Sequence, residues 1–67
     1  RHVDFLALDQ ALAQLEAVDA RKARIVELRY FAGLEMTDIA DVLSISRATA
    51  QRDWDVARTF LFQVLNG

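Results

Sequence analysis

Apolar residues recur at three- and four-residue intervals along most of the chain, a spacing that places them on one face of an α-helix. The first segment of this kind covers residues 4–18 and predicts one amphipathic helix. Its apolar stripe consists of Phe5, Leu8, Leu12 and Leu15. We expect the stripe to be buried against other helices, because large apolar side chains are stabilised by removal from water.

A second helix is predicted over residues 20–31. Asp19 precedes it and can cap it, because a carboxylate oxygen at that position accepts a backbone N–H of the first turn. Gly33 follows it and is expected to end it, since glycine adopts the left-handed conformation after a helix at the lowest cost. The apolar positions are Ile25, Leu28 and Ala32 on one side, with Val26 and Tyr30 next to them.

A short third helix is predicted over residues 36–43 and a long fourth helix over residues 47–65. Between them, Ser46 is a suitable N-cap for the fourth helix, and Ile45 can fill the gap between the two. The apolar face of the third helix consists of Met36, Ile39, Ala40 and Leu43. The inward face of the fourth consists of Ala50, Trp54, Ala57, Leu61 and either Val64 or Leu65. Its outward stripe is Arg47, Gln51, Asp55 and Arg58, flanked by Ala48 and Arg52.

The chain contains no proline and no long alternation of apolar and polar residues, so the sequence predicts an all-α fold, a small four-helix domain. A length of 67 residues leaves room for a single domain, residues 1–67. The chain begins Arg1-His2-Val3-Asp4, without Met and without a secretory pattern, and we therefore expect it to be part of a longer protein.

Several kinds of chemistry have no support in the sequence. The chain has no cysteine, which excludes disulfides, thiolate zinc sites and thiol catalysis and fits the reducing cytoplasm. His2 is the only histidine and has no metal-ligating neighbours. The acidic residues are scattered over outward helical faces rather than paired, and the apolar runs are far too short to span a membrane. We predict a cytoplasmic protein that is not an enzyme and has no metal or cofactor.

The formal net charge of −2 is unusual for a protein that binds nucleic acid, because lysine and arginine supply much of the affinity for phosphate. The charges are, however, unevenly distributed. Residues 1–46 carry an excess of acidic side chains, whereas from residue 47 onward three arginines stand against only Asp53 and Asp55. The last third of the chain is therefore its positive end.

Residues 33–58 combine a two-turn helix, a turn of about three residues and a longer helix with a polar and basic outer face. This is the arrangement of a helix-turn-helix, in which the first helix braces against the DNA backbone and the second lies in the major groove. Only the first turns of the second helix reach base edges. The predicted DNA-binding residues are Arg47, Ala48, Thr49, Gln51, Arg52, Asp55 and Arg58, with Thr37 as a phosphate contact on the bracing helix.

The side-chain chemistry at these positions suits base and phosphate recognition. Arginine can pair bidentately with guanine and glutamine with adenine, while Ala48 or the methyl group of Thr49 can contact a thymine methyl. Arg52 and Arg58 are equally suited to phosphate, which positions a protein without reading sequence. For Asp55, an ion pair with Arg52 or Arg58 is an alternative to a base contact.

Five short motifs follow one another in the chain: ALAQL, DARKAR, VELRYFAGL, IADVLSIS and a final helix containing Trp54, Ala57 and Arg58. Together they resemble region 4 of bacterial RNA polymerase sigma factors, most closely the extracytoplasmic-function group of the sigma-70 family. The resemblance implies that residues 47–58 recognise the −35 promoter element. It also implies that the domain docks on the β-subunit flap of RNA polymerase, and it makes an anti-sigma factor a further candidate partner.

Two other functions are compatible with the same residues. A different helix-turn-helix regulator would share the groove binding but would normally dimerise through its last helix on paired half-sites. A helical protein-interaction module without DNA binding would agree with the net negative charge. Trp54 shares the buried stripe and is expected in the core, whereas Phe60 and Phe62 cannot both be buried by one stripe. At least one of these two phenylalanines is therefore a candidate protein contact.

Overall fold

The computed structural model of the chain describes residues 5–66, which form four α-helices: α1 (Phe5–Val18), α2 (Ala20–Tyr30), α3 (Met36–Leu43) and α4 (Arg47–Asn66). No strand occurs within these residues, and the predicted all-α, four-helix fold is confirmed. Two predictions, the helix start at Asp4 and the isolated His2, lie outside the described residues. The C-terminal ends of α2 and α4 differ from the predicted ends by one residue each.

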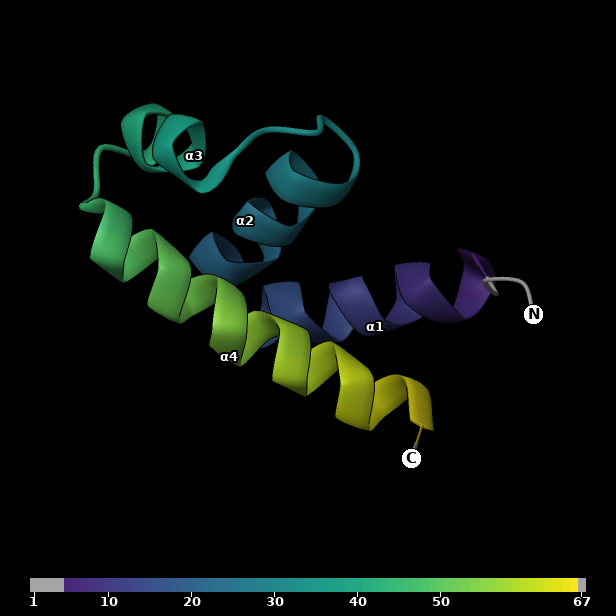
Figure 1. The fold of residues 1–67 in the computed structure, drawn as a ribbon. Helices are drawn as coiled ribbons and strands as arrows, with labels where there is room; N and C mark the ends of the chain where they lie inside the picture. The colour runs from purple at the N-terminus through teal and green to yellow at the C-terminus, as the bar shows by residue number, and fades with distance from the viewer. Residues whose placement is uncertain (1–4, 67) are drawn as a thin grey trace.

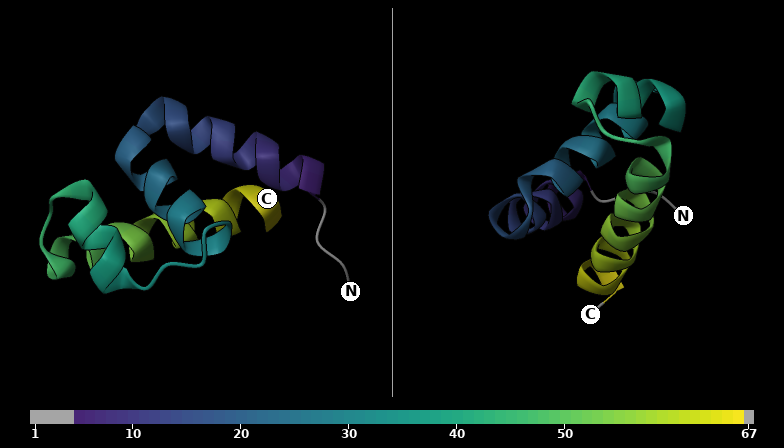
Figure 2. Two further views of the ribbon diagram at one scale, coloured as in Figure 1. Left: turned by 90° about the horizontal axis from the view of Figure 1, so that it is seen from above. Right: turned by 90° about the vertical axis from the view of Figure 1, so that its left-hand side faces the viewer.

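The longest helix, α4, contacts each of the other three helices (Figure 1). With 20 residues it is about 30 Å long, which matches the longest dimension of the molecule, 31 Å. Figures 1 and 2 show α3 beside the first turns of α4 and α1 beside its last turns. The remaining helix, α2, lies between them and contacts the other three. Helices α1 and α3 therefore pack against opposite ends of one long helix.

The buried side chains form two clusters. The first, here called the α1 core, joins α1, α2 and α4 and consists of Ala11, Leu12, Leu15, Ala23, Val26, Ala57 and Leu61. The second, the α3 core, joins α2, α3 and α4 and consists of Ile25, Met36, Ile39, Ala40 and Ala50. Ile25 and Val26 are both fully buried, and because consecutive helical residues point about 100° apart, they belong to different cores. Trp54 is half-buried and packs against both.

Three of the predicted apolar positions are exposed, and the prediction is wrong there: Phe5, Ala32 and Tyr30. Tyr30 is 60% exposed, although its ring stands edge-on to that of Trp54. Phe5 is 70% exposed because it lies in the first turn of α1, where it lines an open groove instead of a closed core. Ala32 is exposed because α2 ends at Tyr30, so the helical spacing no longer applies to it. Of the two alternatives at the end of α4, Val64 packs against the α1 core and Leu65 is exposed.

Both ends of α2 are fixed by the residues predicted for that task. Asp19 caps the helix, since its Oδ1 accepts the N–H of Lys22 at 3.2 Å. Gly33 has a φ of +72°, and beyond it the Leu34 N–H donates to the Leu28 carbonyl at 3.0 Å. A Cβ at Gly33 would meet no atom within 4 Å. The backbone angle, and not a lack of space, therefore favours glycine here.

Candidate nucleic-acid interface

A three-residue turn, residues 44–46, joins α3 to α4. Ser44 is in the left-handed region, with φ 57° and ψ 43°. The Ile45 N–H donates to the Ala40 carbonyl at 3.0 Å, and the Ser44 N–H donates to the Asp41 carbonyl at 3.3 Å. This pair of bonds forms a Schellman motif, which ends α3 and turns the chain. The Ile45 side chain packs against the α3 core, which confirms that it fills the gap between the two helices.

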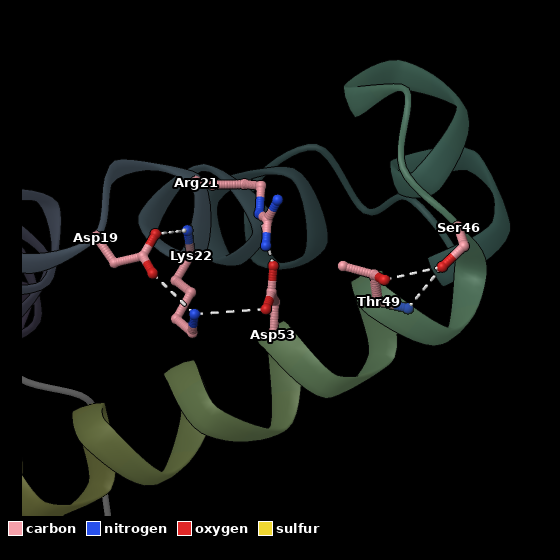
Figure 3. Close-up of polar contacts among 6 residues, drawn as sticks. All are labelled: Asp19, Arg21, Lys22, Ser46, Thr49 and Asp53. Atoms are coloured by element: carbon pink, nitrogen blue, oxygen red, sulfur yellow. Dashed lines mark hydrogen bonds and ion pairs between the residues drawn. The ribbon is translucent and has the colours of Figure 1, made fainter.

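The start of α4 is capped as predicted. Ser46 Oγ accepts the backbone N–H of Thr49 at 3.0 Å, and the Ser46 hydroxyl donates to Thr49 Oγ1 at 2.9 Å (Figure 3). Such a cap satisfies one of the N–H groups that have no acceptor within the helix. Thr49, one of the predicted DNA-binding residues, therefore also has a structural role at the start of the helix.

The predicted DNA-binding residues are accessible. Thr49 and Gln51 are partly covered, and the other six are exposed: Arg47, Ala48, Arg52, Asp55 and Arg58 on α4, and Thr37 on α3. The inner face of α4 carries a different set, Ala50, Asp53, Ala57 and Leu61, all of them buried. The two faces are therefore cleanly separated, and the outer one is free to meet a ligand.

Asp55 links two other residues of this outer face. Gln51 Nε2 donates to Asp55 Oδ1 at 3.2 Å, and Arg58 Nη2 lies 3.8 Å from the same oxygen. The ion pair foreseen as one alternative for Asp55 is thus present, with Arg58 as its partner. Both side chains of the pair are more than half exposed, so it contributes little to stability. The hydrogen bond from Gln51 is the contact that favours one orientation of the Gln51 amide.

A polar hollow of about 250 Å³ lies where the end of α2, the start of α3 and the first turns of α4 meet. It is lined by Arg29, Glu35, Met36, Thr37, Arg47, Gln51 and Trp54. The first N–H groups of α3 have no acceptor within the helix, and the Glu35 side chain makes no capping hydrogen bond to them. Two guanidinium groups and a helix N-terminus together suit an anion such as a DNA phosphate.

Arg29 is the residue of this hollow that the sequence reasoning missed. Its Nη1 donates to the Leu34 carbonyl at 3.0 Å and lies 3.7 Å from Glu35 Oε1, so its guanidinium is tethered to the turn that follows α2. In the sequence it is one of several arginines, and only the path of the chain through the Gly33 turn brings it near Arg47. An arginine in the last turn of a helix directly before a glycine turn was the available signal.

Asp53 differs most from its sequence interpretation. We counted it as a charge that offsets the arginines of α4, but it is buried on the inner face of that helix and only 5% exposed. Its Oδ2 accepts a hydrogen bond from Arg21 Nε at 2.7 Å, and its Oδ1 lies 3.4 Å from Lys22 Nζ (Figure 3). The spacing of Asp53 from Ala50 and Ala57, three and four residues, is the signal that would have placed it there.

Lys22 extends this contact into a network, because its Nζ also lies 2.8 Å from Asp19 Oδ2. Hydrogen bonds from the Lys22 ammonium and backbone N–H hold the pKa of Asp19 below its usual value, and the bond to Asp19 raises the pKa of Lys22. The contribution of Asp19 to stability is therefore present above the usual pKa of aspartate and is lost as the pH falls through the lowered value. That of Lys22 is present below the usual pKa of lysine and is lost as the pH rises through the raised value.

Two further observations describe the surface of residues 5–66. No group of three or more His, Cys, Asp or Glu side chains lies close enough together there to hold a metal ion. None of the four helices combines the length and the apolar character that crossing a membrane requires.

A short amphipathic helix, a capped three-residue turn and a longer helix with a polar outer face have the order expected of a helix-turn-helix DNA-binding unit. A family model described as ECF sigma factor matches residues 1–67, and the chain belongs to this family. Its role is that of a sigma factor in transcription initiation, with RNA polymerase and promoter DNA as partners. The comparisons with curated proteins and with solved structures give no match.

Proposed function

We propose that this chain acts as domain 4 of a sigma factor and recognises the −35 promoter element through α4. The observation that carries the proposal is the exposed polar face on the first turns of α4, directly after the capped turn from α3. In helix-turn-helix proteins these first turns enter the major groove. The proposed activity is non-catalytic DNA binding in the cytoplasm.

The outer face of α4 divides into base-reading and phosphate-binding residues. Arg47, Arg52 and Gln51 would read base edges, because guanidinium and amide groups pair bidentately with guanine and adenine. Ala48 and the Thr49 methyl group would contact thymine methyls. Asp55 would act mainly through Gln51, whose amide it already holds.

The phosphate contacts would come from both sides of the base-reading face. Arg58, one helical turn beyond Asp55, is suited to a phosphate. On the other side, Thr37 and Arg29 line the polar hollow at the start of α3. Contacts of this kind set the position of the protein on the duplex, while the bases set its specificity.

An apolar groove beside the last turns of α4, which shares Arg58 with the proposed DNA-binding face, supports docking on the polymerase. It has a volume of about 440 Å³ and is lined by Phe5, Leu8, Tyr30, Phe31, Arg58, Leu61, Phe62 and Leu65. Phe60 packs against the α1 core, but Phe62 is 68% exposed, in agreement with the expectation that one stripe cannot bury both. Exposed apolar surfaces of this kind are typical of protein interfaces. We assign the groove to the β-subunit flap, and an anti-sigma factor would compete for it.

The experiment that tests the proposed function is transcription from genomic DNA by core RNA polymerase with the full-length parent protein. The Arg52→Glu variant is compared with Arg24→Glu, which reverses another exposed arginine, on α2 and outside the proposed surface. We expect promoter-specific initiation with the wild type, a loss of about 10- to 100-fold in Arg52→Glu and little change in Arg24→Glu.

Other outcomes would each count against a defined part of the proposal. An equal loss in both variants would mean that only total charge matters and would overturn the assigned face. No core-dependent initiation by the wild type would overturn the sigma-factor function of this chain. A stable dimer on paired half-sites would instead favour another kind of helix-turn-helix regulator.

A further inference from the structure

We infer that Asp53 is a positioning residue for promoter recognition: bound to Arg21 and Lys22, it fixes the rotation of α4 and thereby the direction of the base-reading side chains. The inference rests on the proposed function and deepens it. It assigns a role in specificity to a carboxylate that is buried and does not itself face the proposed DNA surface.

The geometry connects the network directly to the outer face of α4. Asp53 follows Gln51 by two residues, which is about 200° around the helix, so its carboxylate points inward where the Gln51 amide points outward. Any rotation of α4 that displaces one side chain displaces the other by the same angle. The contacts to Arg21 and Lys22, at 2.7 and 3.4 Å, are made from α2 and therefore oppose such a rotation.

The neighbouring apolar contacts leave this rotation weakly determined. The fully buried apolar side chains on either side of Asp53 are Ala50, in the α3 core, and Ala57, in the α1 core, and both are small and present a shallow surface. The one large apolar neighbour, Trp54, is only half-buried and lies between the two cores. Uniform and shallow packing determines orientation less well than interlocking side chains do. The planar guanidinium of Arg21, by contrast, bonds a carboxylate only within a narrow range of directions.

The network is also anchored at its far end. Lys22 contacts both Asp53 and Asp19, and Asp19 caps the first turn of α2. As Figure 3 shows, the four side chains form one continuous chain of polar contacts from the start of α2 to the middle of α4. The network therefore connects α4 to the capped first turn of α2, and not only to a flexible side chain.

The Arg21–Asp53 ion pair, in which the carboxylate is buried and the Arg21 side chain is 47% exposed, is poorly explained by stability alone. Desolvation offsets much of the attraction between the charges, and replacing such a pair by apolar residues is often neutral or stabilising. Where buried ion pairs do have an identifiable benefit, it is the selection of one register among several. On α4, the register that matters for function is the rotation of the base-reading face.

The test measures stability and promoter discrimination in the same variants of the full-length protein with core RNA polymerase. Discrimination is the ratio of transcripts from the cognate promoter to transcripts from the same promoter with a scrambled −35 element. We expect the double variant Arg21→Met with Asp53→Leu, which replaces the pair by apolar residues, to keep its thermal stability and to lose about tenfold in this ratio. Asp53→Leu alone leaves Arg21 without its partner and should lose stability as well as discrimination, so its ratio is measured at a temperature at which it is fully folded. Asp53→Asn keeps the shape of the side chain but not the charge, and it provides a second variant if the leucine is poorly accommodated.

Asp41→Asn is the matched control, because it removes one exposed carboxylate from α3 and leaves the network intact. It should raise DNA binding slightly at both templates and leave the ratio unchanged. A double-mutant cycle with Arg21→Met gives the coupling: the double variant Arg21→Met with Asp53→Leu should discriminate no worse than Asp53→Leu alone.

The outcomes separate this inference from the proposed function. A wild type that does not discriminate between the two templates would overturn the proposed function and this inference with it. A discriminating wild type with an unchanged ratio in both Asp53 variants would overturn the inference alone. So would a ratio that falls only in proportion to the folded fraction and recovers at lower temperature, since the role of Asp53 would then be merely structural.

Discussion

The two ends of α4 carry opposite chemistry on one continuous helix. Its first turns present Arg47 and Gln51 beside a polar hollow, whereas its last turns present Phe62 and Leu65 beside an apolar groove. Both halves of the helix are nevertheless packed on the domain by one buried inner stripe, which runs from Ala50 to Leu61.

This difference allows a chain of 67 residues to present two chemically distinct surfaces. The inner stripe of α4 determines the fold, because α2 contacts its middle while α1 and α3 contact its ends. The outer face is not needed for packing, so its residues can be polar at one end and apolar at the other. In our proposal the polar end meets DNA and the apolar end meets the polymerase.

The largest effect is expected from breaking the core beneath one end. Ile39 is fully buried in the α3 core, and Ile39→Ala should lower the free energy of unfolding by about 2–5 kcal/mol, because it leaves a cavity. That is a large share of the stability of so small a domain. Urea denaturation followed by circular dichroism gives the magnitude.

Leu15→Ala in the α1 core is the matched substitution at the other end. Trp54, which packs against both cores, and the helical signal should report one common transition in each variant. Two separate transitions in either variant would show that the two ends unfold independently. That result would contradict the view that α4, which contributes to both cores, makes them one cooperative unit.

A smaller effect is expected from changing the apolar end alone. Phe62→Ser removes an exposed side chain of the groove, and affinity for core RNA polymerase should fall by about 1–2 kcal/mol, because buried aromatic anchors contribute strongly to protein interfaces. Val18→Ser, at the end of α1, is the control, since Val18 is 73% exposed outside this groove. Equal losses in the two variants, or a larger loss in DNA binding than in polymerase binding, would remove the groove from the proposal.

The sequence predicted the helices well because their apolar spacing and caps are local features. Asp19 and Ser46 were identified as caps from residue type and position, and both make the expected hydrogen bonds. Phe5 was misjudged because periodicity shows which face of a helix is apolar but not how far a partner helix covers it. The groove at Phe5 depends on where α2 and α4 end relative to α1, which is a property of the whole fold.

The candidate site was predicted less completely, for a related reason. The helical period of α4 predicts which of its residues face outward. Arg29 lies near these residues only because the chain turns at Gly33. Asp53 belongs to the inner face, where its partners Arg21 and Lys22 on α2 bind it. Contacts between residues more than 30 positions apart have no local signature in one sequence. Charge counting failed at Asp53 for the same reason, since it assigns every carboxylate to the surface.

The smallest effect concerns the turn that joins the two helices of the polar end. Ser44 and Gly33 both have positive φ angles, 57° and 72°, but only one of them is glycine. Because an L side chain is strained in this region, Ser44→Gly should stabilise the domain by about 0.5–1 kcal/mol, or raise Tm by about 2–8 °C. Gly33→Ala should have the opposite sign although its Cβ would meet no neighbour, and Ser44→Ala should not stabilise. If Ser44→Gly leaves Tm unchanged, the left-handed conformation of Ser44 at the end of α3 does not destabilise the folded domain.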